Sequence, residues 1–174
     1  MLVGIMSDSH GDAPVTARAV SLLENRGAKK LFHCGDLCGD HVLDELAGRD
    51  CVFVWGNCDA PSPVLRKYVT SLGLSWPEAP VHVTVAGKRI AVYHGHENGF
   101  FRAKLSPDPG LDYLFYGHSH RYADDRQNGC RLINPGALYR AAVHTVALLD
   151  VKADKLTFLQ VDTGQELSVK SKRP

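Results

Sequence analysis

Apolar and polar residues form regular blocks along the first half of the chain. Short apolar runs alternate there with segments whose apolar positions recur at helical spacing, which predicts strands alternating with helices. Leu2–Met6 is an unbroken apolar run, as expected of a strand that is covered on both faces. Val15–Asn25 has one apolar helical face, with Pro14 suited to its first turn and Gly27 to its end. The pattern predicts an α/β fold.

The rest of the chain continues this pattern and then changes to alternation at every other position. Two further strands and two further helices complete the first half: Lys30–His33, Asp40–Ala47, Val52–Trp55 and Val64–Leu72. In the second half, alternation predicts additional strands, several of them antiparallel. They are Val81–Val85, Ile90–Tyr93, Tyr113–Tyr116, Arg131–Ile133, His144–Leu149 and Lys155–Val161. Two stacked sheets with helices outside are the simplest layered arrangement of these elements.

Length and charge narrow the classes of protein to consider. The 174 residues fit a single domain covering residues 1–174, with Lys170–Pro174 as a frayed polar tail. The formal net charge of +1 provides no basic stripe, so we expect no specific nucleic-acid binding. The chain contains no apolar run of about 18 or more residues, and we expect no signal peptide. We therefore expect a cytoplasmic protein that does not bind a membrane.

The cysteines do not suggest a disulfide framework, because there are five of them and three lie in apolar surroundings. Cys34, Cys51 and Cys130 lie within or beside apolar runs, where a buried reduced thiol is common. Cys34 and Cys38 have the spacing of a metal knuckle, but no second Cys/His pair completes a tetrahedral set. We expect reduced thiols, as in cytosolic proteins, and no structural zinc.

Polar clusters rich in metal-ligating side chains stand where the predicted strands end. The six clusters are Asp8-Ser9-His10, Gly35-Asp36, Gly56-Asn57-Cys58-Asp59, His94-Gly95-His96, Gly117-His118-Ser119-His120 and Asn134-Pro135-Gly136. Ligands of open α/β sheets gather outside the carboxyl ends of the strands, where residues far apart in sequence can meet. We therefore expect these clusters to converge on one pocket.

The donor types in these clusters favour a pair of transition metals. Asp8 and His10 are alternate residues of what we expect to be an extended stretch, so their side chains should point to the same side. The carboxylate of Asp36 can bridge two cations, and Asn57 offers a neutral amide oxygen. The imidazole donors are His94, His118 and His120. Mixed oxygen and nitrogen donors suit manganese, iron, zinc, cobalt or nickel better than calcium or magnesium.

Taken in order, these clusters resemble the signature of the calcineurin-like metallophosphoesterases over residues 1 to about 140. The trailing Asn134-Pro135-Gly136 resembles the small prokaryotic phosphodiesterase branch of that family. The resemblance implies a four-layer αββα sandwich of two mixed β-sheets flanked by helices. It also implies two divalent metals per chain, with manganese as our first expectation. It assigns Asp8, His10 and His120 to one metal, Asn57, His94 and His118 to the other, and Asp36 to both.

The resemblance implies a phosphodiesterase in which a metal-activated hydroxide attacks the phosphorus of a small phosphodiester. Two alternatives remain open. The first is a non-catalytic interaction scaffold, because a retromer subunit reuses this fold, and the second is a small-molecule phosphomonoesterase. The presence of all seven predicted ligands favours catalysis. The resemblance also suggests a homodimer or a homotetramer. We expect a shallow, open site, because the loops 60–80 and 97–110 are too short to form a cap domain.

Three further residues are candidates for a direct role in the reaction. Cys58 stands where many family members have histidine, and cysteine there resembles the small phosphodiesterase branch. A thiol cannot act as a cationic imidazolium, which makes monoester hydrolysis less attractive. Asp59 either takes part or hydrogen-bonds a neighbouring ligand. His96 either contacts phosphate or supports the ligands.

Two other residues near these clusters are candidates for supporting roles. For His33 we expect a packed or hydrogen-bonded role. Asn134 either forms a turn or braces the histidine loops.

Overall fold

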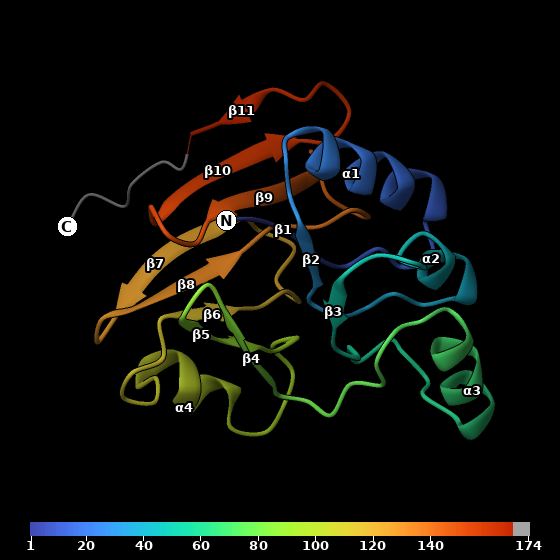
Figure 1. Cartoon of the computed structure of the whole chain (residues 1–174), viewed down its shortest axis with the longest axis horizontal. Coiled ribbons are helices and arrows are strands. Elements are labelled where there is room, and N and C mark those ends of the chain that lie inside the picture. Colours follow the sequence, from blue (N-terminus) through green and yellow to red (C-terminus); the bar gives the residue numbers. More distant parts are fainter. Residues whose placement is uncertain (169–174) are drawn as a thin grey trace.

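Two mixed β-sheets stacked face to face form the centre of the fold, which the computed structural model describes for residues 1–168 (Figure 1). The first sheet has six strands, in the order β11 (Glu166–Leu167), β10 (Lys155–Gln160), β9 (Thr145–Asp150), β1 (Leu2–Met6), β2 (Lys30–His33) and β3 (Cys51–Phe53). The second sheet has five, in the order β4 (Val81–Val85), β5 (Lys88–Val92), β6 (Tyr113–Phe115), β8 (Cys130–Asn134) and β7 (Ala123–Gln127).

Each sheet contains three neighbouring parallel strands. In the first sheet, β2 pairs in parallel with β1 and with β3, so that His33 lies opposite both Met6 and Phe53. In the second sheet, β6 pairs in parallel with β5 and β8, and Phe115 lies opposite Val92 and Ile133. The remaining pairings are antiparallel. Loops that follow neighbouring parallel strands leave a sheet at the same edge, and this edge carries the site described below.

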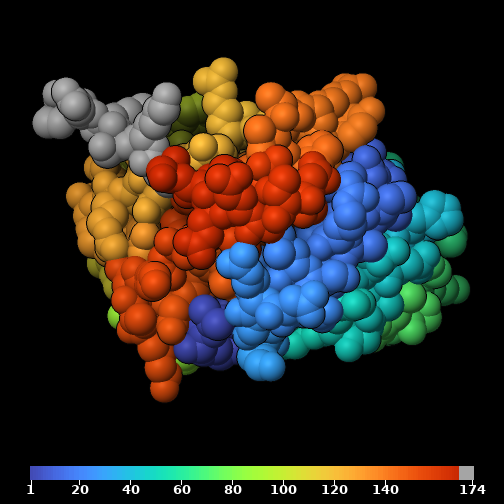
Figure 2. Space-filling model, turned by 90° about the horizontal axis from the view of Figure 1, so that it is seen from above, coloured from blue at the N-terminus to red at the C-terminus, as the bar shows by residue number. Residues whose placement is uncertain are grey.

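Helices cover the outer faces of both sheets and complete four layers (Figure 1). The first sheet carries α1 (Ala13–Asn25), α2 (Asp40–Asp44) and α3 (Pro63–Ser71), which share a buried apolar cluster with its outer face. Within residues 1–168, the second sheet carries one helix, α4 (Phe100–Leu105), whose Phe100 packs on Ala91 and Leu114. The predicted αββα sandwich is therefore confirmed. Figure 2 shows the outside of the first sheet, where β10 and β11 lie beside α1.

The alternation within β1 explains how one strand supports two layers. Val3 and Ile5 point into the apolar core between the sheets, where Phe32 and Phe115 meet edge to face with ring centroids 5.1 Å apart. Gly4 points to the opposite side, and a Cβ there would approach Leu23 of α1 to 2.7 Å. A glycine at this position therefore lets α1 pack closely on the sheet.

The observed elements differ from the predicted ones where local sequence carries a weak signal. The predicted helix Asp40–Ala47 ends earlier, at Asp44. The sequence did not predict α4, which is only six residues long, or the two-residue strand β11. It also missed β7, a polar strand whose pairing is supported by an ion pair from Arg131 of β8 to Asp124. Polar edge strands form through their partners rather than through their own apolar pattern.

Two expectations concern the ends and the environment of the chain. The frayed tail predicted at Lys170–Pro174 lies outside the described residues. Within residues 1–168, none of the helices has the length and the apolar character needed to cross a membrane.

Candidate metal centre

The loops at the shared edge of the two sheets bring the predicted metal ligands together. The loop after β1 carries Asp8 and His10, the loop after β2 carries Asp36, and the loop after β3 carries Asn57. The loops of the second sheet supply the remaining three predicted ligands. Those three are His94 after β5, and His118 and His120 after β6.

The first group of ligand atoms lies around His120. Its Nε2 is 3.2 Å from His10 Nε2 and 3.3 Å from Asp8 Oδ1. Asp36 Oδ2 lies 3.5 Å from His10 Nε2 and therefore belongs to the same group. Two carboxylate oxygens and two imidazole nitrogens thus face one small volume.

The second group lies around His94. Its Nε2 is 3.0 Å from Asn57 Oδ1 and 3.3 Å from His118 Nδ1. The same Asp36 Oδ2 lies 3.4 Å from His94 Nε2, so this oxygen stands between the two groups. The arrangement has the form expected of two cation positions that share one bridging carboxylate.

Two features of these groups fit divalent cations. Among the described residues, the buried Asp8 Oδ1 has no hydrogen-bond partner. A buried polar atom without a partner carries a desolvation penalty, which a bound cation would remove. The imidazole nitrogens of His10 and His120 also face each other with carboxylate oxygens beside them. The donor set is a mixture of oxygen and nitrogen, which suits transition metals.

Backbone groups orient the ligand atoms toward the centre. His94 is fully buried, and its Nδ1 donates a hydrogen bond to the carbonyl of Cys34 at 2.7 Å, which leaves Nε2 free to bind a cation. The amide of Cys58 donates to Asp36 Oδ1 at 2.8 Å, and the amide of His118 donates to Asp8 Oδ2 at 3.1 Å. The second oxygen of each carboxylate therefore faces the site.

The two carboxylates differ in their electrostatics. Burial raises the pKa of Asp8 above its ordinary value, although the nearby imidazoles act in the opposite direction. Burial also opposes ionisation of Asp36, but the nearby His94 side chain and a hydrogen bond from the amide of Cys58 hold its pKa well below the usual range. Asp36 is thus ionised at neutral pH.

Five of the seven predicted ligands adopt a left-handed backbone, which is uncommon for residues with a Cβ. Their φ angles are 57° for Asp8, 44° for His10, 55° for Asp36, 66° for His118 and 55° for His120. The expectation that Asp8 and His10 belong to an extended stretch is therefore wrong. The strand ends at Met6, and a tight loop directs both side chains to the same group. Such strain, about 1–3 kcal/mol for each residue, is typical of functional sites.

Two glycines allow the loops to approach each other at this edge. A Cβ on Gly56 would lie 2.1 Å from Asp36 Oδ1, and a Cβ on Gly35, whose φ is +94°, would lie 2.6 Å from His94 Nδ1. Both distances are shorter than any real contact of a Cβ. The glycines in these motifs therefore provide space for the side chains of the predicted ligands.

The three candidate catalytic residues occupy different positions. Cys58 is exposed at the mouth of the site, and the Asn57 side-chain amide contacts its Sγ at 3.4 Å. Asp59 accepts hydrogen bonds from the amides of Cys38 and Gly56, both at 2.7 Å, so it braces the loop backbone instead of bonding to a ligand side chain. The ring of His96 lies 5.3 Å from that of His94, and its side chain is about one-third exposed.

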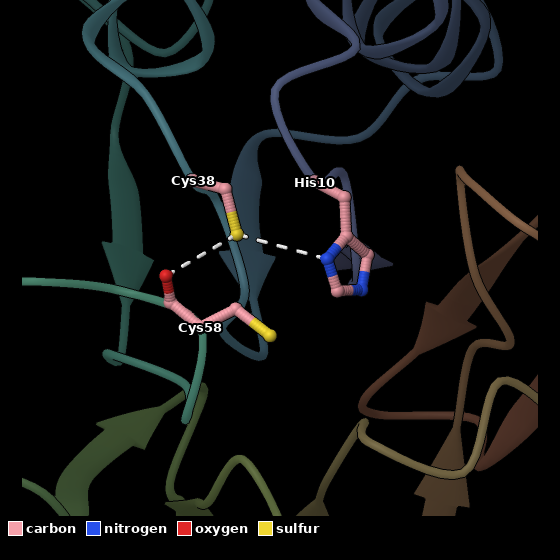
Figure 3. A group of neighbouring side chains, drawn as sticks. All are labelled: His10, Cys38 and Cys58. Carbon is pink, nitrogen blue, oxygen red and sulfur yellow. Dashed lines mark hydrogen bonds between the residues drawn. The ribbon is translucent and has the colours of Figure 1, made fainter.

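The thiol of Cys38 lies beside this centre, as Figure 3 shows. Its Sγ is 3.7 Å from His10 Nδ1 and 3.6 Å from the carbonyl oxygen of Cys58. Burial and nearby carboxylates raise the pKa of Cys38 to about 12. The pKa of Cys58 is also raised, by desolvation and by the negative charge of Asp36. Both thiols therefore keep their protons at neutral pH and act as weak hydrogen-bond donors.

Supporting residues complete the site, and one of them was not identified from the sequence. Glu97 accepts hydrogen bonds from the amides of His94 at 2.6 Å and Gly95 at 2.7 Å. The only sequence signal was a carboxylate just after the His94 cluster. The side-chain amide of Asn134 donates to the carbonyl of Gly117 at 2.8 Å, so it braces the His118 loop.

His33 has the hydrogen-bonded role expected from the sequence. Its Nδ1 accepts from the amide of Gly35 at 3.2 Å, and its Nε2 lies 2.8 Å from Ser9 Oγ. The side chain is fully buried between the loops that follow β1 and β2. It therefore links the two loops that carry the carboxylate ligands.

Comparisons with known proteins agree with this geometry. A family model described as the calcineurin-like phosphoesterase superfamily domain matches residues 1–154. The chain is 24% identical over 158 residues to the phosphodiesterase MJ0936 of Methanocaldococcus jannaschii, covering 87% of this chain and 94% of that protein. It is 26% identical over 176 residues to the probable metallophosphoesterase YsnB of Bacillus subtilis, covering 96% and 95%.

Solved structures share the fold over nearly the whole chain. An archaeal phosphodiesterase superposes with a TM-score of 0.82 at 22% identity, covering 92% of this chain and 99% of that one. The phosphoesterase YfcE of E. coli gives 0.72 at 26% identity, covering 97% of each chain. Vps29 of Entamoeba histolytica in complex with zinc gives 0.62 at 18% identity, covering 96% of each chain.

Proposed function

The chain belongs to the calcineurin-like phosphoesterase superfamily, and on this premise we propose that it hydrolyses small phosphodiesters with the help of two bound divalent metals. The observation that supports this most directly is the position of Asp36 Oδ2, which lies within 3.5 Å of an imidazole nitrogen in each ligand group. One ionised carboxylate between two groups of oxygen and nitrogen donors suits a pair of cations.

The predicted ligands would divide between two metals. Asp8, His10 and His120 would hold one, Asn57, His94 and His118 the other, and Asp36 both. When bound, such a pair supplies positive charge to the phosphate and activates water for attack. The mixed donor set favours manganese, with iron, zinc, cobalt or nickel as alternatives.

Side chains at the mouth of the site favour diesters as substrates. The protonated thiol of Cys58 lies next to Asn57 and can donate only weakly to a departing oxygen. His96, beside His94, can contact a non-bridging oxygen of the phosphate. Asp59 bonds only to backbone amides here, so we assign it a positioning role. Esters with good leaving groups therefore suffer least from the absence of a strong acid.

The test combines metal analysis with activity measurements. Protein purified without chelators is analysed for metal content and assayed with Mn²⁺ on bis(p-nitrophenyl) phosphate and on p-nitrophenyl phosphate. We expect two metals per chain and a higher kcat/KM on the diester. Metal-loaded protein that hydrolyses neither ester would favour the scaffold hypothesis. A higher kcat/KM on the monoester would favour a phosphomonoesterase.

A further inference from the structure

A cavity opens directly beside the predicted metal centre. It measures about 430 Å³, and its lining residues include His120, one of the predicted ligands. Arg121 follows His120 in the chain, and Arg140 lines the cavity as well. The side chain of His120 is 25% exposed and lines the cavity, so the cavity and the centre adjoin each other at this residue.

Two arginines line the cavity, and neither has an acidic partner in the described part of the protein. Within residues 1–168, neither Arg121 nor Arg140 forms an ion pair, and the residues that line the cavity include no carboxylate. Five other arginines of the described residues do have acidic partners, among them Arg49 with Glu24 and Arg126 with Asp154, whereas Arg66, Arg89 and Arg102 have none. Two guanidinium groups beside one hollow therefore lack a counter-ion.

The position of Arg140 is connected to the predicted metal centre by packing. Its guanidinium carbon lies 5.3 Å from the centroid of the Tyr139 ring, and that ring lies 5.8 Å from the ring of His10. The backbone at Arg140 is left-handed, with φ +50°. The far side of this segment is held by Thr145, whose hydroxyl donates to the carbonyl of Pro135 at 2.8 Å. Arg140 is thus held on a constrained turn.

We propose that this cavity binds a second phosphate group of the substrate, so that the preferred diester is one such as a 5′-phosphorylated dinucleotide. This inference rests on the proposed function. A planar guanidinium binds phosphate through two parallel hydrogen bonds, and two arginines around one cavity select for a dianionic group. The diester to be cleaved lies at the metal centre, and the terminal phosphate lies against Arg121 and Arg140.

The other walls suit the remainder of such a substrate. Tyr122, Ala141 and Val143 provide apolar surface, and Val143 is 40% exposed. Sites for small organic ligands combine apolar walls with a few polar groups that fix orientation, and their volumes are typically about 300–1,000 Å³. The cavity is therefore large enough for the sugar that joins the two phosphates.

The kinetic test compares a dinucleotide that carries a 5′-phosphate with the same dinucleotide without it, by following cleavage of the internal diester. The wild-type protein should prefer the phosphorylated form by at least about 10-fold in kcat/KM. In Arg121→Ala and Arg140→Ala, KM for that form should rise by about 10-fold, and the double variant should lose the preference. Arg140→Lys keeps the positive charge but loses the paired hydrogen bonds, so its preference for the phosphorylated form should lie between those of Arg140→Ala and the wild type.

Two controls separate this effect from damage to the fold. Arg102→Ala removes an exposed arginine of α4 that does not line the cavity, so the preference should stay as in the wild type. Hydrolysis of bis(p-nitrophenyl) phosphate, which has no second phosphate, should stay as in the wild type in Arg102→Ala, and in the Arg121 and Arg140 variants it should fall far less than cleavage of the phosphorylated dinucleotide. The proposal is wrong if the wild type shows no preference, or if the double variant retains it.

A binding measurement decides the proposal even if no diester is hydrolysed, an outcome that would refute only the proposed function. Calorimetry with metal-loaded protein compares adenosine 3′,5′-bisphosphate with adenosine 3′-monophosphate. The bisphosphate should bind about 10-fold more tightly, and the double variant should bind both ligands equally. Equal affinities in the wild type would overturn the proposal.

Discussion

The two sheets contribute different chemistry to one edge of the molecule. Loops after strands of the first sheet carry all the oxygen donors and one imidazole: Asp8, His10, Asp36 and Asn57. Loops after strands of the second sheet carry imidazoles alone: His94, His118 and His120. Each ligand group contains residues from both sheets. Neither sheet therefore holds a complete set, and the packing between the sheets is part of the site.

The sheets also hold their ligands in different ways. In the first sheet, the buried His33 links the loops after β1 and β2, and Asp59 ties the loop after β3 to the amide of Cys38. In the second sheet, Glu97 and Asn134 support the histidine loops through backbone groups. The first sheet thus fixes the position of charge, while the second fixes the direction of neutral nitrogen donors. This difference between the sheets can be tested at the shared carboxylate, at the supporting carboxylates, at Cys58 and at His33.

The largest effect is expected where the two ligand groups meet. Asp36→Asn removes the shared charge, so both metals should bind more weakly and kcat/KM on an activated diester should fall by more than about 100-fold. Asp8→Ala should affect mainly the group around His120, because Asp8 Oδ1 lies 3.3 Å from His120 Nε2, whereas His118 of the other group meets Asp8 through its backbone amide. The measurement is metal stoichiometry by titration with Mn²⁺. Two tightly bound metals in Asp36→Asn would contradict the shared role of this carboxylate.

The next test compares one supporting carboxylate from each sheet. Glu97→Gln and Asp59→Asn each replace an acceptor that holds two backbone amides, and each should lower metal affinity by about 10–100-fold. Glu97→Gln should weaken mainly the group around His94, and Asp59→Asn the part that contains Asn57 and Asp36. Glu78→Gln changes an exposed glutamate and should have no effect. Unchanged metal affinity in both variants would show that these carboxylates do not position the ligands.

The sequence predicted the strands and the positions of the ligands well, because both depend on local patterns. An apolar run followed by a polar cluster marks a strand and its functional loop, and all five such pairs lie where they were expected. Support through backbone groups was less visible. Glu97 acts through backbone amides, which leave no pattern in the sequence. The left-handed backbone at Asp8 and His10 was missed for a similar reason, since the surrounding loops impose it.

A smaller effect is expected at Cys58, which lies at the mouth of the site on the loop after β3. Cys58→His supplies a donor whose ordinary pKa is about 6.5, whereas an ordinary thiol has a pKa of about 8.5. Activity should therefore rise more for diesters with poor leaving groups, which need a proton, than for activated aryl diesters. Cys58→Ser should change activated-diester cleavage only mildly.

The measurement is kcat/KM on both kinds of diester, with metal occupancy checked in each variant. Equal changes on both diesters in Cys58→His, at full occupancy, would argue against a position near the leaving group. A large and uniform loss in Cys58→Ser would indicate that the thiol itself takes part in the reaction.

The last prediction concerns pH and the support of the first sheet. Burial, with a smaller contribution from His94, lowers the pKa of His33 to about 3. Its Nδ1 accepts from the Gly35 amide, so a proton on this nitrogen would break that hydrogen bond. The unfolded chain binds this proton below about pH 6.5 and the folded chain does not. The free energy of unfolding should therefore fall by up to about 1.4 kcal/mol per pH unit as pH drops from 6.5 toward 3.

Urea unfolding of metal-free protein between pH 4 and pH 7 measures this slope without any contribution from bound metal. His33→Gln cannot titrate, so it should be less stable at pH 7 but lose less stability on acidification. His82→Gln removes an exposed histidine of β4 and should keep the slope of the wild type. Equal slopes in the wild type and in His33→Gln would mean that His33 titrates alike in both states. The loops that carry the carboxylates would then not depend on a neutral imidazole at His33. The first sheet would in that case not hold its predicted ligands through this buried side chain.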